Sequence, residues 1–327
     1  PYDYDAAADC PTWRKFLKSS LSDPFVVSLP DSTSPDGDGL ARDIDGWARA
    51  RVLQEFAGYT LEPSNRRFQR AMLLIGSGAN GKSVFLGTLE KVFGPKNVSH
   101  VSIADLARDF HRWPLKDSLI NISADEAQSF NGGESVFKSA TAGDPLSDSK
   151  KGHDIVSFTA RAKWWLALNR LPRARDKSFG FLRRFTFVSF KNRFVESPTR
   201  PDELKADPDL ERKLENELPG IFNWCLEGYR RLLTQGGFTE SPDQLALSEE
   251  LGALTNPLRA FVKECVVGQS GRVERGELYE KYRTWALQEG GQPMSARAFF
   301  PEFREALNEA GFTFREIKSH GSRVYDF

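Results

Sequence analysis

Short apolar runs alternate with amphipathic segments through the middle of the chain. Four runs have the length and composition of buried strands: residues 71–75, 119–123, 164–168 and 185–190. Apolar positions between them recur at helical spacing, for example over residues 84–93. Strands that alternate with helices favour an α/β fold built on a sheet. We therefore predict an α/β core over residues 66–235.

Helical patterns come before this core. Residues 12–20 and 44–58 have the apolar spacing of amphipathic helices. Residues 29–39 lie between them and are rich in Pro, Gly, Ser and Asp, as loops are. These patterns predict a small, collar-like helical domain over residues 1–65.

Helical patterns also follow the last strand of the core. We expect helices over residues 202–218 and 221–233, the first ended by Pro219 and Gly220. Residues 236–242 then have the composition of a linker.

The tail has a pattern of its own. We expect helices over residues 258–267, 275–288 and 296–310. Two short strand-like runs follow, at residues 312–318 and 323–327, with a turn between them at residues 319–322. Three helices and a terminal hairpin predict a winged helix over residues 250–327, a relative of the helix-turn-helix that often binds DNA. A helical cap without nucleic-acid contact remains open, because winged helices also serve as protein interfaces.

Composition narrows the class of protein. Charged residues make up 28% and hydrophobic residues 39% of the 327 positions, as in ordinary globular proteins. No apolar run approaches the ~18 residues of a membrane span, and no signal-peptide pattern opens the chain, so we expect a cytoplasmic protein without membrane contact. Cys10, Cys225 and Cys265 are far apart, which argues against disulfides and zinc. The chain begins with Pro1 rather than Met, and we expect it to be part of a longer polypeptide.

Positive charge is concentrated in one part of a neutral chain. The 45 basic and 45 acidic residues balance. Between Lys150 and Arg193, however, twelve Lys and Arg residues face only two acids, Asp154 and Asp176. A local basic belt of this kind predicts a polyanionic partner that is contacted at one place.

The segment GSGANGKS fits the phosphate-loop pattern G-x-x-x-x-G-K-[ST], and it lies between a predicted strand and a predicted helix. Glycines let successive N–H groups point at phosphate oxygens, and the helix N-terminus adds a favourable dipole. Lys82 would reach the β/γ-phosphates and Ser83 would hold Mg²⁺. The residues expected to contact ATP are Gly76, Ser77, Gly78, Ala79, Asn80, Gly81, Lys82, Ser83 and Val84. A glycine-rich turn that happens to contain Lys-Ser is the alternative.

Polar side chains follow two later strands. Asp125 and Glu126 follow the predicted strand at residues 119–123. We expect Asp125 to help hold Mg²⁺ and Glu126 to polarise the attacking water. Asn169 follows the next strand, where it could hydrogen-bond the γ-phosphate or the water, or merely turn the chain. Arg183 and Arg184 precede the last strand. An arginine that reaches a neighbouring subunit's site can stabilise transition-state charge; a surface salt bridge is the alternative.

The ordered set GSGANGKS, ISADE, TAGDPLSDSKKGHDIVSF, WWLALNRLP and FLRRFTFVSF resembles superfamily 3 helicases, in particular the helicase part of primase-helicases from phages, phage satellites, plasmids and poxviruses. The runs LQEFAGYTL and GELYEKYRTWALQEGG are similar to that group as well. The resemblance implies an AAA+ type P-loop ATPase core and a homo-hexameric ring that hydrolyses ATP at subunit interfaces. It also implies single-stranded DNA in the channel of the ring and a primase or primase-polymerase domain upstream.

The resemblance also assigns residues. Arg184, directly before the final strand, matches the arginine finger better than Arg183. The segment of residues 141–158 matches a hairpin that faces the channel, where related rings carry an adjacent Lys-His pair. In this chain the resemblance assigns DNA binding to Lys150, Lys151 and His153, and Gly152 separates the lysines from the histidine. A packaging or loading motor, and an initiator that ATP only locks into an assembly, remain alternative functions.

Overall fold

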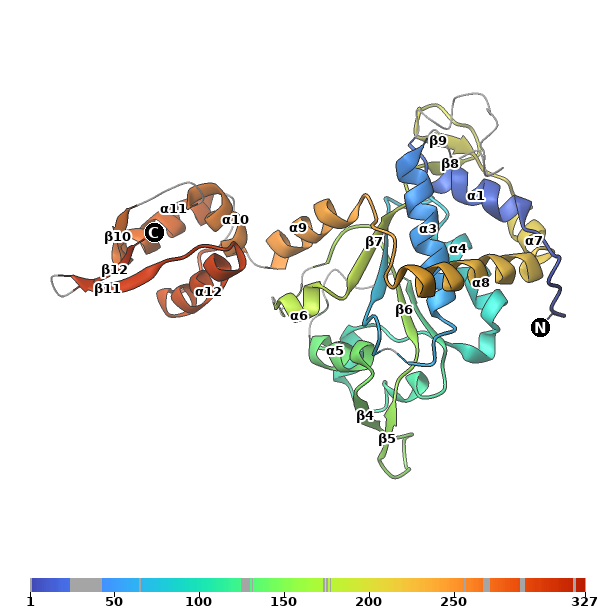
Figure 1. Ribbon diagram of the computed structural model, residues 1–327, viewed down its shortest axis with the longest axis horizontal. Coiled ribbons are helices and arrows are strands. Elements are labelled where there is room, and N and C mark those ends of the chain that lie inside the picture. Colours follow the sequence, from blue (N-terminus) through green and yellow to red (C-terminus); the bar gives the residue numbers. More distant parts are fainter. Residues whose placement is uncertain are drawn as a thin grey trace. The chain divides into compact units, whose positions relative to one another are not determined.

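The computed structural model describes residues 2–23, 43–64, 66–124, 130, 132–172, 174, 176, 178–255, 257–266, 271–288, 292–319 and 322–326. The chain folds into two compact units, Pro1–Ser248 and Glu249–Phe327 (Figure 1).

A parallel sheet forms the centre of the first unit. Its strands are β1 (Ala71–Ile75), β2 (Val98–Ser99), β3 (Ile120–Ala124), β6 (Lys163–Leu168) and β7 (Phe185–Ser189), in the order β2-β3-β6-β1-β7. Ala71 of β1 is in register with Trp164 on one side and Phe185 on the other. Because every neighbouring pair is parallel, the carboxyl ends of all five strands lie at one edge. The predicted α/β sheet is confirmed; the two-residue strand β2 is too short for a sequence pattern to reveal.

Helices cover both faces of this sheet. Met72 and Leu74 of β1 pack on one face into a core shared with α1 (Pro11–Leu21), α3 (Ile44–Tyr59), α4 (Lys82–Phe93) and α8 (Leu218–Gln235). On the other face lie α5 (Glu134–Ala142) and α6 (Phe179–Leu182). The ring of Phe137 in α5 lies 5.3 Å from that of Trp164. Alternate residues of β1 therefore serve two cores, as the two-residue period of a strand requires.

Two glycines let α3 and α8 approach closely, and the helices cross in Figure 1. A Cβ atom on Gly58 would lie 2.4 Å from the carbonyl oxygen of Cys225, and one on Gly228 would lie 2.1 Å from that of Gln54. Backbone contact of this kind excludes any larger side chain. The N-terminal helices and the sheet consequently share one core, so the predicted boundary between residues 65 and 66 falls inside a compact unit.

The predicted helix over residues 202–218 is wrong. Strand β9 (Glu203–Lys205) pairs in parallel with β8 (Arg193–Val195), and only α7 (Leu210–Glu215) is helical. Pro208 explains the difference, because a proline inside a helix removes a hydrogen bond and clashes with the preceding turn. Pro219 lies in the first turn of α8, which begins at Leu218, instead of ending a helix; its missing N–H favours that position.

Short elements connect β2, β3 and β6. They are η2 (Ala104–Ala107) and η3 (Trp113–Leu115) before β3, and an antiparallel hairpin of β4 (Pro145–Asp148) and β5 (Val156–Thr159) before β6, while η1 (Pro95–Asn97) joins α4 to β2. The hairpin lies in the segment where the resemblance implies one.

The second unit contains α10 (Pro257–Cys265), α11 (Arg275–Gln288) and α12 (Ala296–Glu309), with an antiparallel sheet of β10 (Arg272–Glu274), β12 (Ser322–Asp326) and β11 (Arg315–Ser319) in that order. Aromatic rings fill its core, among them Phe261, Tyr282, Phe299, Phe303 and Tyr325. Three helices followed by a hairpin match the expected element order, and their assignment as a winged helix stays a prediction. The boundary between the units falls within α9 (Gln244–Thr255), which the sequence pattern does not predict.

Across the described ranges, no helix combines the length and apolar character that crossing a membrane requires.

Candidate nucleotide site and nucleic-acid surface

The segment 76–81 forms a tight loop between β1 and α4. Gly78, Ala79 and Gly81 have positive φ angles of 98°, 52° and 90°. A Cβ atom on Gly76 would lie 2.9 Å from the backbone oxygen of Phe190 and would also displace the Asn80 side chain, so glycine fits best there. Helix α4 begins at Lys82 directly after this loop, and its first N–H groups point out of the helix. The strand, loop and helix thus follow one another as the phosphate-loop pattern requires.

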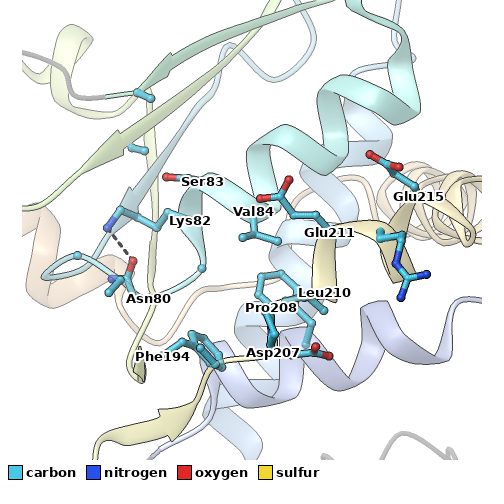
Figure 2. A pocket seen from close by; sticks show the side chains of 18 of the residues that line it. Asn80, Lys82, Ser83, Val84, Phe194, Asp207, Pro208, Leu210, Glu211 and Glu215 are labelled. Carbon is cyan, nitrogen blue, oxygen red and sulfur yellow. Dashed lines mark hydrogen bonds between the residues drawn. The ribbon is translucent and has the colours of Figure 1, made fainter. Parts of the chain in front are cut away.

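Lys82 lies at the centre of this loop, and only 6% of it is exposed. Its Nζ donates hydrogen bonds to Gly76 O at 2.6 Å, Asn80 Oδ1 at 3.0 Å and Asn169 Oδ1 at 3.4 Å. Figure 2 shows the Lys82 side chain directed towards Asn80. The structure therefore brings together Lys82, directly after the loop that follows β1, and Asn169, the residue directly after β6.

Ser83 is exposed in the first turn of α4, on the same cavity. Asp125 and Glu126 lie outside the described residues. The residue before them, Ala124, ends β3 and lines this cavity too. Within the described ranges, which leave out residues 125–129, no cluster of three His, Cys, Asp or Glu residues could hold a metal.

A cavity of about 810 Å³ extends from the phosphate loop. That size is in the range of small-molecule sites. Phe194, Pro208 and Leu210 form an apolar wall across from Ser83 and Val84 (Figure 2). The Phe194 N–H donates to Ala79 O at 2.6 Å, which ties this wall to the phosphate loop. The carboxylates of Asp207, Glu211 and Glu215 also line the cavity. No sequence motif identifies these residues, because they approach the loop from more than 100 positions away.

Arg183 and Arg184 lie at the edge of the sheet opposite the phosphate loop. They precede β7, and Ala71 N at the start of β1 donates to Arg184 O at 2.7 Å. The phosphate loop follows the other end of β1. Five residues of strand separate the two edges by roughly 15 Å. Within one chain, neither arginine is therefore next to the cavity.

The two arginines have different surroundings. Arg184 is 7% exposed, and its guanidinium donates to Thr141 Oγ1 at 2.9 Å, to Lys138 O at 3.3 Å and to Gly180 O. Burial, and next the charge of Arg183, lower the pKa of Arg184. Arg183 is exposed, and its Nη2 donates to Gln69 Oε1 at 2.7 Å. Arg184 thus has a structural role in its own chain, whereas Arg183 faces outward.

Lys150, Lys151 and His153 are exposed together on the turn between β4 and β5. Ile155 on the same turn is 77% exposed, which is unusual for an isoleucine. Lys150 Nζ lies 5.7 Å from the ring centre of Trp113, and Lys116 Nζ lies 4.7 Å from it. The hairpin therefore combines cations with an aromatic ring from a second segment.

That second segment, residues 110–113, has no place in the sequence-based prediction. Phe110 is 48% exposed and has a positive φ of 69°. The stretch FHRWPLK interleaves aromatic and basic residues, and this signal could have identified it. We call the hairpin turn 149–155 and the segment 110–113 together the basic-aromatic surface.

The basic belt predicted between Lys150 and Arg193 does not form one surface. Lys163 is fully buried at the start of β6, and Arg184 is buried before β7. Lys191 and Arg193 follow the opposite end of β7, near Asp243 and Glu203. Of the belt residues named here, the hairpin lysines alone belong to the basic-aromatic surface, and Arg173, Arg175 and Lys177 lie outside the described residues. The count along the sequence therefore overstates the charge available at one place.

Two family models match separate parts of the chain. Residues 74–184 match a family of unknown function, DUF5906, and residues 255–326 match the family described as poxvirus D5 protein-like. Each match covers less than half of the chain. No curated protein matches it.

Solved structures also match the chain, at low identity. The apo structure of the NrS-1 C-terminal region (305–718) is 13% identical with a TM-score of 0.51, over 100% of this chain and 79% of that one. Two A-form apo structures of that region are 15% and 13% identical, with TM-scores of 0.46 and 0.48. They cover 84% and 93% of this chain and 70% and 78% of their own chains. At 13% identity the likeness to the first of these structures concerns the fold alone.

Proposed function

We propose that the chain is an ATP-driven DNA helicase of the superfamily 3, AAA+ type, and that it acts as a ring on single-stranded DNA. It would be the helicase part of a primase-helicase from a phage or another mobile element. The match of residues 255–326 to the poxvirus D5-like family supports this context. The winged-helix assignment of that unit, and its contact with DNA or protein, belong to the same proposal.

ATP binding is supported by the loop and the cavity together. The N–H groups at the start of α4 and the Lys82 ammonium are suited to bind the phosphates. The apolar wall of Phe194, Pro208 and Leu210 is suited to contact the flat face of the nucleobase. The exposed Ser83 hydroxyl fits a Mg²⁺ ligand, and Asp125 would be another. Bound Mg²⁺ would neutralise phosphate charge. Glu126 would orient the attacking water, and Asn169 would hydrogen-bond the γ-phosphate.

The position of the arginines carries the proposal of a ring. Arg183 lies at the edge of the sheet opposite its own phosphate loop, so a nucleotide that it contacts must belong to a neighbouring copy. An arginine finger supplied in this way accelerates phosphoryl transfer by roughly 10³–10⁵. Exposure favours Arg183 over Arg184, because the guanidinium of Arg184 is already bound within its own chain.

The basic-aromatic surface supports single-stranded DNA as the partner. Lys150, Lys151 and His153 offer phosphate contacts, while Phe110 offers a face on which a base can stack. Proteins that bind single strands commonly combine these two features.

Complementation between inactive subunits tests the proposal. Arg183→Ala subunits retain a complete phosphate loop, and Lys82→Ala subunits retain the arginine. Each variant alone should hydrolyse almost no ATP, and mixing them should restore DNA-stimulated hydrolysis and strand separation. The matched control is Arg67→Ala, which removes another exposed arginine near that edge of the sheet and should leave hydrolysis intact.

Two results would overturn the proposal. One is the absence of recovery at every mixing ratio although mixed assemblies are shown to form. The other is full hydrolysis by a protein that remains monomeric when saturated with nucleotide and oligonucleotide.

A further inference from the structure

Asp148 is a buried carboxylate that holds the segment 110–113. It ends β4, and 6% of it is exposed. Its Oδ1 accepts from Phe110 N at 2.9 Å, and its Oδ2 accepts from Arg112 N at 2.8 Å and Trp113 N at 2.9 Å. Hydrogen bonds to an ionised acceptor are about twice as strong as neutral ones. One side chain of the hairpin thus fixes three backbone N–H groups of another segment.

Further contacts join this segment to both strands of the hairpin. Arg112 Nη1 donates to Ser147 O in β4 at 3.3 Å. The Trp113 ring lies 6.5 Å from that of Phe158 in β5, at an angle of 74°. Asp148 is nevertheless the group that accepts from the backbone itself, so it decides the conformation of the segment.

The conformation at Phe110 depends on this anchor. A positive φ is sterically unfavourable for a bulky residue, and it persists only where surrounding contacts impose it. Asp148 bonds the N–H of Phe110 itself, while the phenyl ring remains half exposed. The hydrogen bond therefore determines where an exposed aromatic ring stands relative to the cations of the hairpin.

We propose that Asp148 is a positioning residue for nucleic-acid binding. It joins the segment 110–113 to the hairpin, so that the ring of Phe110 and the lysines of the turn act on one single strand as a rigid surface. This inference rests on the proposed DNA binding. Bases would stack on Phe110 while Lys150 and Lys151 contact phosphates on the same strand.

The direction in which Asp148→Asn changes DNA affinity distinguishes a positioning role from an effect of charge. Removing an acidic group near DNA should strengthen binding, because less negative charge repels the phosphates. Asp148→Asn should instead weaken binding of a fluorescent oligothymidylate about tenfold, since one amide oxygen cannot accept from all three N–H groups and the stacked base is lost. The matched control is Asp154→Asn, which makes the same charge change on the exposed turn. It should leave affinity unchanged or raise it.

A double-mutant cycle shows whether Asp148 acts through Phe110. Phe110→Ala should weaken DNA binding by a similar factor, and adding Asp148→Asn to it should weaken binding little further. Hydrogen exchange provides an independent measurement on the full chain. Asp148→Asn should speed exchange at the amides of Phe110, Arg112 and Trp113, whereas Phe110→Ala should leave the amides of Arg112 and Trp113 protected.

The outcomes distinguish the two proposals. A wild-type chain that binds no single-stranded DNA overturns both. Wild-type binding together with faster exchange in Asp148→Asn but unchanged affinity overturns only the positioning role. Equal effects of Asp148→Asn and Asp154→Asn on affinity would overturn it as well, because charge alone would then explain them.

Discussion

Lys82 Nζ lies 3.4 Å from Asn169 Oδ1, although 87 positions separate the two residues. The contact exists because β1 and β6 are parallel neighbours whose carboxyl ends meet at one edge. Under the proposed function, Lys82 and Asn169 would act on the same phosphate.

Asn169→Ala should separate binding from turnover. Removing one preorganised hydrogen-bond donor from a transition state costs about 10²–10³ in kcat. We expect a loss of that size with nearly unchanged nucleotide affinity, whereas Lys82→Ala should abolish both. Phosphate release and binding of a fluorescent ATP analogue measure the two quantities. Lys96→Ala, an exposed lysine outside the cavity, is the control, and full turnover in Asn169→Ala would contradict the assigned role.

Motifs whose residues are adjacent in the chain could be predicted from the sequence. The G-x-x-x-x-G-K-[ST] loop and four strands follow from local patterns, because spacing along the chain determines them, whereas the hairpin is expected only from the family resemblance. The apolar wall at Phe194 and the anchor at Asp148 could not be predicted, because they depend on contacts between distant segments. Arg184 illustrates the same limit: its position before β7 is visible in the sequence, but its burial against α5 is not.

Arg183→Ala and Arg184→Ala should fail in different ways. Arg184→Ala removes a buried guanidinium and leaves acceptors such as Thr141 Oγ1 without their donor, so we expect a loss of about 2–4 kcal/mol in the free energy of unfolding. Arg183→Ala changes an exposed side chain and should alter stability by no more than about 0.5 kcal/mol. Its hydrolysis rate should nevertheless fall by roughly 10³ or more. Urea unfolding and ATP turnover distinguish the two; a stable, active Arg183→Ala protein would argue against the finger.

Lys163 should make stability depend on pH. Burial is the main cause that lowers its pKa to about 7; the charge of Glu62 opposes this shift and that of Arg161 adds to it. Its Nζ donates to Glu62 O at 2.6 Å and Arg161 O at 2.8 Å. Between pH 7 and the ordinary lysine pKa of about 10.4, the unfolded chain binds this proton and the folded chain does not. The contribution of Lys163 to stability must therefore rise with pH across that window and be lowest below pH 7.

Lys163→Met supplies the comparison, because it removes this titration and keeps a long side chain. The free energy of unfolding, measured in urea from pH 6 to pH 10, should rise more steeply with pH in the wild type than in the variant. Parallel curves would mean that the folded chain keeps Lys163 protonated throughout the range.

Arg49 and Asp243 should stabilise the outer edge of β7, the last strand of the sheet. Arg49 Nε donates to Asp243 Oδ2 at 2.8 Å and Nη2 donates to Oδ1 at 3.0 Å, with both side chains buried. Asp243 Oδ2 also accepts from Ser189 N at 2.8 Å, and Ser241 Oγ donates to Phe187 O at 2.6 Å. Side chains after α8 thus occupy hydrogen-bonding groups that an edge strand would otherwise leave free.

Asp243→Ala would leave the Arg49 guanidinium buried without its carboxylate, and it would free Ser189 N. We expect a loss of about 3–5 kcal/mol in the free energy of unfolding, as for other broken buried pairs. Replacing both partners by Arg49→Met and Asp243→Leu should cost less than the sum of the single variants, since no charge is then left unpaired. Asp202→Ala, which breaks an exposed pair with Arg200, should change stability by no more than about 1 kcal/mol. Urea unfolding of the wild type, of each single variant and of the double variant measures these differences. If Asp243→Ala is no less stable than Asp202→Ala, the buried pair does not hold this edge, because a carboxylate that supports both α3 and β7 could not be removed without loss.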